Sequence, residues 1–185
     1  MNIWLIRHGE TEWSLSGAHT GRTDLPLTRS GEKKAERIRN VLAGHSFALV
    51  LTSPLERARR TCEIAGLADQ AQIDPNLMEW DYGDYEGRTT NEIRKERPGW
   101  SLFRDGVPNG ETVAQVGARA LDVIDRAIQS DGDVALFAHG HILRILGACW
   151  LDLPAEDGKL FYLDTAGIGI LGFEHENRVM RRWNI

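Results

Sequence analysis

The sequence of 185 residues has little of three features that define large classes of proteins. It contains only two cysteines, Cys62 and Cys149, which excludes a scaffold held by disulfides and favours a reducing compartment. No apolar run approaches the roughly 20 residues of a membrane-spanning helix, and the longest candidate, residues 145–151, is bounded by charged residues. Arg7 and Glu10 interrupt the N-terminus almost at once, so we expect no signal peptide and a cytoplasmic protein.

An excess of positive charge is also absent. The chain has 22 Lys and Arg against 27 Asp and Glu, a formal net charge of −5 at pH 7. This balance disfavours binding to nucleic acid or to an anionic membrane, and we predict neither partner. Hydrophobic residues make up 42% and charged residues 26%, close to globular averages, and the length suits one domain covering residues 1–185. Composition does not distinguish a monomer from a homodimer.

Apolar runs and helical periodicities alternate along the chain. Residues 2–6, 47–52 and 134–138 are apolar runs without polar alternation, as is typical of strands covered on both faces. Residues 160–183 predict two or three strands with no helix between them, which indicates an antiparallel edge. The sequence therefore predicts an α/β fold, a three-layer α/β/α sandwich with a mainly parallel sheet and an antiparallel edge strand.

Capping signals mark several helix starts. Thr28 or Ser30 is the candidate N-cap of the first long helix, and Thr112 begins a capping box that ends at Gln115. The Ser-Pro-Leu-Glu sequence starting at Ser53 fits a second capping box with proline at the first helical position. Further predicted helices cover about residues 54–65, 90–96, 113–132 and 140–150.

Each of the three clear strand-to-helix junctions carries cationic or potentially cationic groups. Arg7 and His8 follow the first strand, Arg57 lies in the helix after the second, and His139 follows the third. Ligands of open α/β sheets bind outside the carboxyl ends of the strands, so the sequence predicts a compact anion pocket there. A glycine follows each histidine, which would admit a ligand to the backbone and free the following N–H groups for an anion.

Two chemistries could use this set of side chains. In phosphoryl transfer, a neutral imidazole attacks phosphorus while guanidinium groups stabilise the equatorial oxygens. In a metal site, His139 and His141 would join Asp81 or Asp84. Neighbouring arginines disfavour a dication, and His141 points elsewhere if the helix has begun, so we prefer phosphoryl transfer and predict no metal. The three remaining histidines are predicted to be structural: His19, His45 and His175.

A phosphatase also needs a proton donor for the leaving alkoxide. The candidates lie in residues 77–87, here called the acid loop, where carboxylates stand beside aromatic residues. Crowding and desolvation would raise the pKa of such carboxyl groups by repulsion and by penalising the charged form. The residues alone leave four candidates open: Glu79, Asp81, Asp84 and Glu86.

A G-x-G-x-x-G pattern at residues 167–172 is a weaker signal. No plausible helix follows it, and too few residues remain to complete a βαβ unit. We predict that these glycines permit close packing between edge strands and that they do not bind a nucleotide.

Six segments together resemble the motifs of the histidine phosphatase superfamily, also called phosphoglycerate mutase-like proteins. They occur in the family's order and cover nearly the whole chain. The acid loop and residues 165–173 look most like a branch that contains fungal sedoheptulose-1,7-bisphosphatase and broad-range bacterial acid phosphatases. The segments are 5–11 (LIRHGET), 20–28 (TGRTDLPLT), 53–58 (SPLERA), 79–87 (EWDYGDYEG), 109–112 (NGET) and 138–141 (AHGH).

The resemblance implies a role for each matching residue. His8 would be the nucleophile that becomes phosphohistidine. Arg7, Arg57 and His139 would form the phosphate pocket around it. Glu79 would be the general acid for the leaving group and then the base for water. Together, the resemblance and these residues imply a small phosphorylated metabolite as substrate, a sugar phosphate or bisphosphate, and no cofactor.

Other matching residues would touch phosphate or substrate: Ser14, Thr20, Gly21 and the backbone of Gly140. Ser14 stands where mutases of the family usually have asparagine. Walls of the substrate side are harder to assign, and packing or surface roles are at least as plausible for each candidate. Those candidates are Arg22, Trp100, Arg104 and Asn109.

The segment after the acid loop bears on the type of reaction. Mutases of the family usually carry a longer insertion there, whereas this chain has only residues 88–108. A less enclosed site admits water to the phosphohistidine and favours hydrolysis. We therefore expect a metal-independent phosphatase, with a 2,3-bisphosphoglycerate-dependent phosphoglycerate mutase as the alternative. A catalytically silent phosphate-binding module is a third reading, which the intact set of motif residues disfavours.

Overall fold

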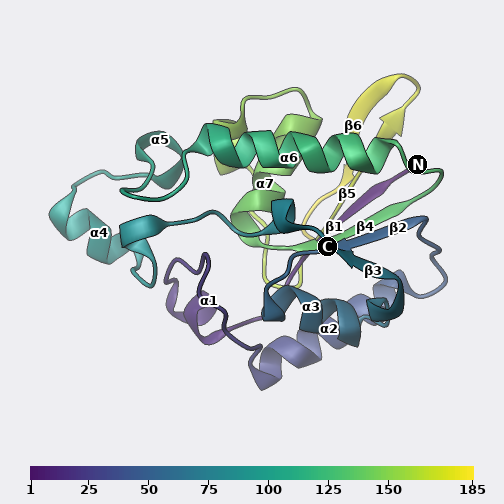
Figure 1. Cartoon of the computed structure of the whole chain (residues 1–185), viewed down its shortest axis with the longest axis horizontal. Helices are drawn as coiled ribbons and strands as arrows, with labels where there is room; N and C mark the ends of the chain where they lie inside the picture. The colour runs from purple at the N-terminus through teal and green to yellow at the C-terminus, as the bar shows by residue number, and fades with distance from the viewer.

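The computed structural model describes residues 1–185 and places a six-stranded sheet between two layers of helices (Figure 1). The strand order is β3-β2-β4-β1-β5-β6; the first four strands in this order run parallel, and β5 and β6 are antiparallel. The predicted α/β sandwich with an antiparallel edge is confirmed. The strands are β1 (Ile3–Arg7), β2 (Leu49–Thr52), β3 (Ala71–Ile73), β4 (Val134–Ala138), β5 (Ile168–Glu174) and β6 (Asn177–Arg182).

The long helices cover the two faces of the sheet, and the short ones lie beyond the carboxyl ends of the parallel strands (Figure 1). No helix combines the length and apolar character needed to cross a membrane. One face carries α2 (Arg29–Leu42) and α3 (Glu56–Ile64), and the other carries α6 (Val113–Ile128) and α7 (Gly140–Trp150). The short helices are α1 (Glu12–Ser16), α4 (Thr90–Glu96) and α5 (Leu102–Asp105).

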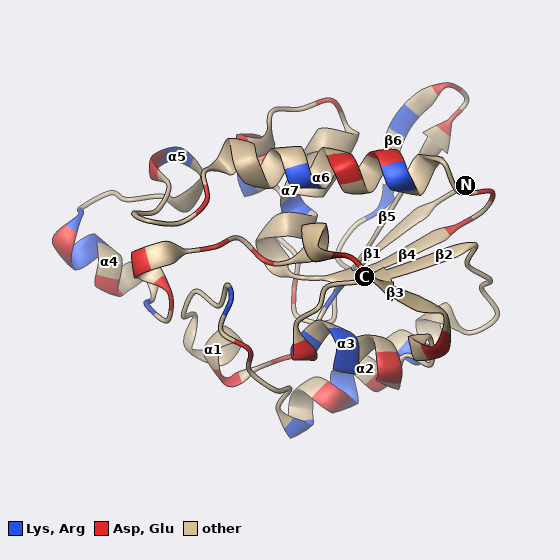
Figure 2. Cartoon of the chain, in the orientation of Figure 1, with Lys and Arg blue, Asp and Glu red and all other residues tan.

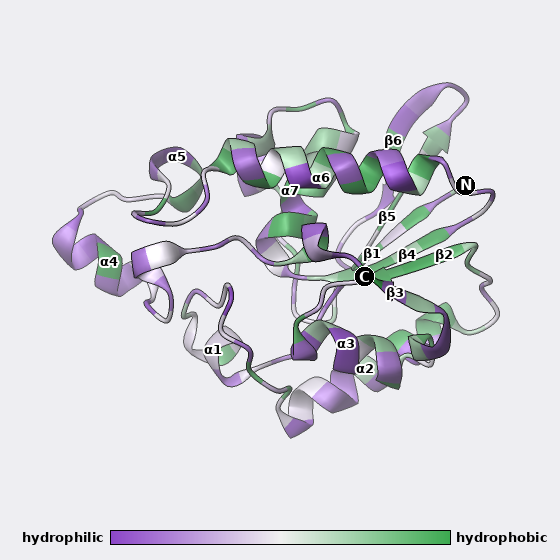
Figure 3. Ribbon diagram, viewed as in Figure 1, coloured by the Kyte–Doolittle hydropathy of each residue, from purple (hydrophilic) through white to green (hydrophobic).

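The central strands are buried on both faces, as their uninterrupted apolar runs predict. Successive side chains of a strand point to opposite faces. Ile3 and Leu5 therefore join the cluster beneath α6 and α7, while Trp4 and Ile6 join the cluster beneath α2 and α3. Figure 3 shows green along the central strands and much of α7, with purple segments on the other long helices and on the edge strand β6. This two-sided burial holds the strand ends in register.

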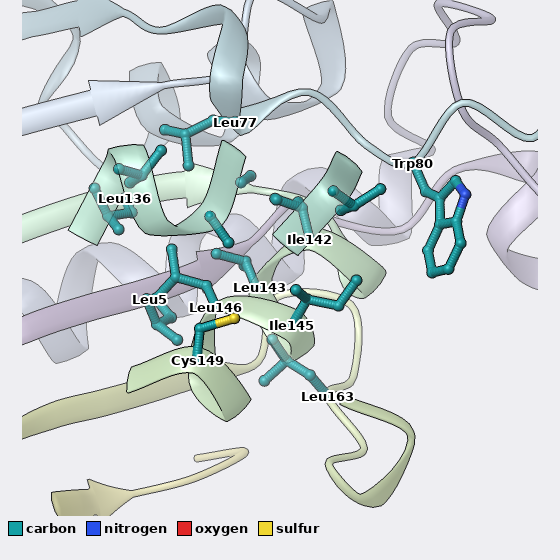
Figure 4. Packing of buried hydrophobic residues seen from close by; sticks show 14 of the residues in the cluster. Leu5, Leu77, Trp80, Leu136, Ile142, Leu143, Ile145, Leu146, Cys149 and Leu163 are labelled. Atoms are coloured by element: carbon teal, nitrogen blue, oxygen red, sulfur yellow. The ribbon is translucent and has the colours of Figure 1, made fainter. Parts of the chain in front are cut away.

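Helix α7 is apolar on almost every side, because nine of its 11 residues are buried. Figure 4 shows Ile142 and Leu146 of this helix beside Leu5 and Leu136 of the sheet. A helix in this setting is fixed by packing all around it. Its N-terminal residue Gly140 is separated from β4 by His139 alone, so the first turn has a defined position at the carboxyl end of the sheet.

Two predicted caps are confirmed and one is wrong. Thr28 caps α2, and Thr112 forms the expected capping box at α6. The capping box predicted at Ser53 does not form, because α3 begins at Glu56 and its N-cap, Leu55, makes no side-chain capping bond. Instead, the carboxylate of Asp24 accepts the N–H of Glu56 at 2.9 Å. The Ser53 hydroxyl is thereby left for a partner in the site.

Most charged residues lie in the helices, in the loops and on the edge strand β6, with both signs mixed over the helices. Figure 2 shows Lys and Arg alternating with Asp and Glu along α2, α3 and α6, while the strands between them are largely free of charge. The cationic side chains at the strand ends therefore stand apart from this mixed outer surface.

Candidate active site

The predicted residues gather at a cavity of about 240 Å³ outside the carboxyl ends of β1 and β4. Arg7, His8 and Glu79 all line it. Four larger hollows, of about 260 to 690 Å³, contain none of the predicted catalytic or phosphate-binding residues. The site thus forms where the topology of an open α/β sheet places ligands.

His8, the first residue after β1, is buried and has its two ring nitrogens in different settings. Nδ1 lies 2.6 Å from the carbonyl oxygen of Gly9. A carbonyl only accepts, so Nδ1 carries the proton and donates it, and Nε2 keeps its lone pair. Burial first, and then the charges of Arg57 and Arg7, hold the pKa of His8 well below its usual value. The result is an uncharged imidazole with a free nitrogen beside the cavity.

Arg7, the last residue of β1, lies against His8 as a half-buried cation. Its Nη1 donates to the carbonyl oxygen of Leu163 at 2.6 Å, but its sealed Nε has no partner. Arg7 takes part in none of the ion pairs of the protein. A Cβ at Gly140 would lie 3.3 Å from the guanidinium carbon, so glycine there leaves room for the group. The other terminal nitrogen, Nη2, also has no partner in the protein and is not sealed, so this cation keeps a donor that can receive an anion.

Arg57 of α3 is fully buried and lies behind the cavity wall. Its Nη2 donates to the carbonyl oxygens of Thr20 and Gly21, and its Nη1 donates to that of Thr23 at 2.9 Å. Its Nε donates to Nδ1 of His139 at 3.1 Å. Arg57 therefore joins the loop after α1 to the end of β4, while its charge acts on His8.

His139 follows β4 and is also fully buried behind the cavity. Because Nδ1 accepts from Arg57, the neutral ring carries its proton on Nε2, which lies 2.7 Å from Ser53 Oγ. Burial and the charge of Arg57 lower the pKa of His139 well below its usual value. Its ring centroid is 5.1 Å from that of His8, so it supports the nucleophilic ring from behind.

The remaining motif residues lie at the rim or one step behind it. Ser14, Thr20 and Gly140 line the cavity, whereas Gly21 does not. The Ser14 hydroxyl is engaged in the capping box of α1. The Gly21 N–H donates to the carboxylate of Glu86 at 2.9 Å. Glu86 and Arg57 thus hold the two sides of this loop.

Glu79 is held at the cavity wall by three main-chain donors. Its two oxygens accept the N–H groups of Trp80 at 2.9 Å, His141 at 2.9 Å and Ile142 at 3.0 Å. The last two belong to the first turn of α7, whose positive dipole end favours a carboxylate. This fixes the position of the carboxyl group relative to His8 and Arg7.

The same contacts correct the predicted use of the glycines. The N–H groups that follow Gly140 are not free for an external anion, because they bind Glu79. At the other histidine, the N–H of Gly9 donates to the hydroxyl of Thr61 at 3.0 Å. The main chain is therefore used to position the site, and the donor that stays open to an anion is a side-chain nitrogen, Nη2 of Arg7.

The four candidate acids separate in the structure, so the predicted crowding of carboxylates is wrong. Asp81 pairs with Arg22 at 2.6 Å, and Asp84 accepts from the amide of Asn109 at 2.9 Å. Glu86 holds the loop after α1, as described above. Only Glu79 of the four lines the cavity.

None of the four substrate-side candidates, Arg22, Trp100, Arg104 and Asn109, lines the cavity. Trp100 is buried and donates to the carbonyl oxygen of Gly106, and Arg104 pairs with Asp105 on the surface. These side chains have packing or surface roles in the structure. The walls on this side come from other residues.

Sequence reasoning missed the side chains that do form these walls. His19, predicted to be structural, lines the cavity together with Tyr82, His141, Arg144 and Tyr162. No single sequence pattern marks these residues, because they come from separate segments: the turn after α1, the acid loop, α7 and residue 162 near β5. Burial lowers the pKa of His19 to about 4. At neutral pH this wall is largely uncharged.

An ion pair from α6 positions the acid loop. Arg119 contacts Glu111 with two nitrogens, both at 2.8 Å, and its Nη1 donates to the carbonyl oxygens of Asn76 and Met78. Glu111 in turn accepts the N–H of Asp81 at 2.9 Å. The residues on both sides of Glu79 are therefore tied to one helix.

The two histidines of the alternative metal site have separate partners. His139 contacts Ser53 and Arg57, whereas Nδ1 of His141 lies 2.5 Å from the hydroxyl of Tyr82. No three His, Cys, Asp or Glu side chains come together in an arrangement that could hold a metal ion.

Known proteins share this fold and these motifs. The family model of the histidine phosphatase superfamily (branch 1) matches residues 3–185. An acid phosphatase of Mycobacterium tuberculosis is 42% identical over 177 residues, which cover 94% of this chain and 87% of that protein. Sedoheptulose 1,7-bisphosphatase of Saccharomyces cerevisiae is 35% identical over 238 residues, with 94% and 88% covered.

A solved structure agrees with the sequence matches. The structure of the open reading frame Rv3214 from Mycobacterium tuberculosis superposes with a TM-score of 0.95 at 40% identity. The match covers 100% of this chain and 97% of that one. The chain therefore belongs to the histidine phosphatase superfamily and is a phosphoric monoester hydrolase.

Proposed function

We propose that the protein is a metal-independent phosphatase that hydrolyses phosphomonoesters of small metabolites, sugar phosphates or bisphosphates, through a phosphohistidine on His8. One observation carries the proposal. The free Nε2 of the uncharged His8 ring lies beside Arg7, a half-buried cation that has no anionic partner in the protein. The names of the acid phosphatase and bisphosphatase relatives support this substrate class.

In the first step, Nε2 of His8 attacks the phosphorus of the bound ester. An N–P bond forms as the P–O bond to the leaving group breaks, and Arg7 stabilises the charge on the equatorial oxygens. Glu79, in its acid form, transfers its proton to the departing oxygen, because an alkoxide leaves poorly without one. The three main-chain donors keep Glu79 at the wall of the same cavity.

In the second step, water attacks the phosphohistidine. The Glu79 carboxylate takes a proton from this water, the N–P bond breaks, and phosphate leaves with the new oxygen. His8 regains its lone pair, and Glu79 returns to the acid form. Arg57 and His139 hold His8 and the loop after α1 in place during both steps. We assign these two residues to the phosphate pocket, as the side chains directly behind its wall.

The experiment measures phosphate release in EDTA from a panel of sugar monophosphates, sugar bisphosphates and phosphoglycerates. Turnover of one or more sugar esters is expected, because no step uses a metal ion. Activity that depends on an added divalent cation contradicts the proposal. Interconversion of phosphoglycerates primed by 2,3-bisphosphoglycerate, faster than phosphate release, assigns the protein to the mutase alternative.

A further inference from the structure

Three rings form the part of the cavity wall that the phosphate chemistry does not use. His19 lies in the turn after α1, Tyr82 in the acid loop and His141 in the first turn of α7. The ring centroids of His19 and Tyr82 are 4.8 Å apart, those of Tyr82 and His141 are 5.8 Å apart, and those of His19 and His141 are 6.3 Å apart. Segments distant in the sequence thus build one continuous wall.

The hydrogen bond between Tyr82 and His141 sets the tautomer of the histidine. Burial raises the pKa of Tyr82 well above its usual value, so the phenol keeps its proton and donates it to Nδ1 at 2.5 Å. Burial, and then the charge of Arg144, lower the pKa of His141 well below its usual value. A neutral imidazole that accepts at Nδ1 carries its proton on Nε2.

Nε2 of His141 is available to a ligand. It has no hydrogen-bond partner in the protein, and Arg7 Nε is the only sealed side-chain polar atom without one. The His141 Nε2 atom therefore keeps contact with the cavity. The ring is held by the edge-to-face packing of Phe103 at 5.4 Å and by the Tyr82 hydroxyl, so its orientation is fixed before a ligand arrives.

The charge of this wall restricts what it can bind. Arg144 is the only cation near it besides Arg7, and its Nε and Nη2 already donate to the carbonyl oxygens of Gly158 and Lys159. Glu79 is the only acidic side chain that lines the cavity. Neutral hydrogen-bond donors and acceptors carried by aromatic rings bind ligand groups that are polar, uncharged and rich in hydroxyls.

We infer that His19, Tyr82 and His141 form the leaving-group subsite, that this subsite takes a polyhydroxylated leaving group, and that Nε2–H of His141 donates to one of its oxygens. The inference rests on the proposed function, because a leaving group exists only if the ester is cleaved at His8. It makes His141 a specificity-determining residue. The Tyr82 hydroxyl is then the group that orients it.

The test compares two substrates of the intact protein: the sugar phosphate that it hydrolyses fastest, and phenyl phosphate, whose leaving group offers no further hydroxyl. His141→Phe keeps a ring but removes the donor. We expect kcat/KM for the sugar phosphate to fall about 10- to 100-fold, the loss of one or two hydrogen bonds, and that for phenyl phosphate to change less than about threefold. Tyr82→Phe should act in the same direction, by about three- to tenfold.

Two further variants serve as controls, one conservative and one remote from the site. His141→Gln restores an N–H donor and should recover part of the lost sugar phosphate activity. His45→Phe, an exposed position outside the site, should change neither substrate. Equal losses on both substrates in the His141 and Tyr82 variants, or no loss on either, overturn the inference while the proposed function stands. A wild-type protein that hydrolyses neither substrate overturns both.

Discussion

The phosphate end and the leaving-group end of the cavity are built in different ways. At the phosphate end, Arg7 is the last residue of β1 and His8 follows it directly, while Arg57 and His139 support them from behind. At the leaving-group end, the walls come from loops and from the first turn of α7. One end is cationic and attached to the sheet, and the other is largely neutral and assembled from separate segments. The chemistry is thus placed by the sheet, and recognition by the connections around it.

The physical reason lies in the rigidity of the strand ends. β1 is paired on both sides, with β4 and β5, and its side chains are buried on both faces. A residue one position after such a strand has little freedom, so His8 needs few further contacts to be positioned. The leaving-group wall lacks this support and depends on contacts such as that between Tyr82 and His141.

The largest loss of activity is expected at the phosphate end of the cavity. His8→Ala removes the nucleophile, and we expect kcat to fall at least about 10⁴-fold for sugar and aryl phosphates alike. Trapping of a phosphoenzyme in acid should fail for this variant and succeed for the wild type. The exposed His45→Ala is the matched control. Retained turnover in a clean preparation of the His8 variant would show that the site does not work through this residue.

Glu79 serves both ends of the cavity, and its replacement should reduce kcat by different factors for substrates with poor and with good leaving groups. Glu79→Gln cannot supply a proton, so we expect about a 10²- to 10³-fold fall in kcat for sugar phosphates. p-Nitrophenyl phosphate has a good leaving group and should lose much less. Steady-state kinetics on both substrates measure the ratio. Equal losses would argue that Glu79 contributes to binding or stability and not to proton transfer.

The acid loop should depend on its attachment to α6. Arg119→Gln breaks a largely buried pair with Glu111 and removes donors from two carbonyl oxygens, so we expect a loss of about 3 kcal/mol in the free energy of unfolding. Urea denaturation measures this loss. Arg104→Gln, which breaks a pair whose arginine is largely exposed, should cost less than about 1 kcal/mol. Similar values for the two variants would mean that the acid loop holds its position without Arg119.

Acid should destabilise the leaving-group end through His19. The folded state lowers the pKa of His19 from 6.5 to about 4, so the unfolded chain binds the proton more readily between these values. Stability therefore falls as the pH drops from about 6.5 toward 4, and His19 alone accounts for about 2 kcal/mol by pH 5. Thermal unfolding across this range should show a shallower loss for His19→Gln than for the wild type. His45→Gln should follow the wild-type curve, and an unchanged slope in the His19 variant would contradict the burial argument.

Much of the fold follows from local patterns in the chain. The apolar runs predicted β1, β2 and β4, and the cap at Thr112 predicted the start of α6. β3 was not predicted, because it has only three residues and two of them are exposed. The cap at Ser53 was wrong because its hydroxyl contacts a histidine 86 residues away, which no local pattern contains.

The candidate site divides in the same way. The motif around His8 singled it out as the proposed nucleophile, and its position could be predicted because the strand that places it adjoins it in the sequence. The choice of Glu79 among four carboxylates came from resemblance, and the residues alone left it open. In the structure, Asp81, Asp84 and Glu86 turn to partners of their own, and Glu79 alone stays at the cavity.

Local patterns in the sequence are enough to predict the central strands, the long helices and the cationic residues at the strand ends, because burial periodicity and adjacency are properties of neighbouring residues. Only the tertiary structure decided which nitrogens are free, which carboxylate reaches the cavity and which rings form its neutral wall. Tyr82 and His141 are 59 residues apart, and their hydrogen bond exists because the packing of α7 against the sheet and the ion pair between Arg119 and Glu111 bring them together.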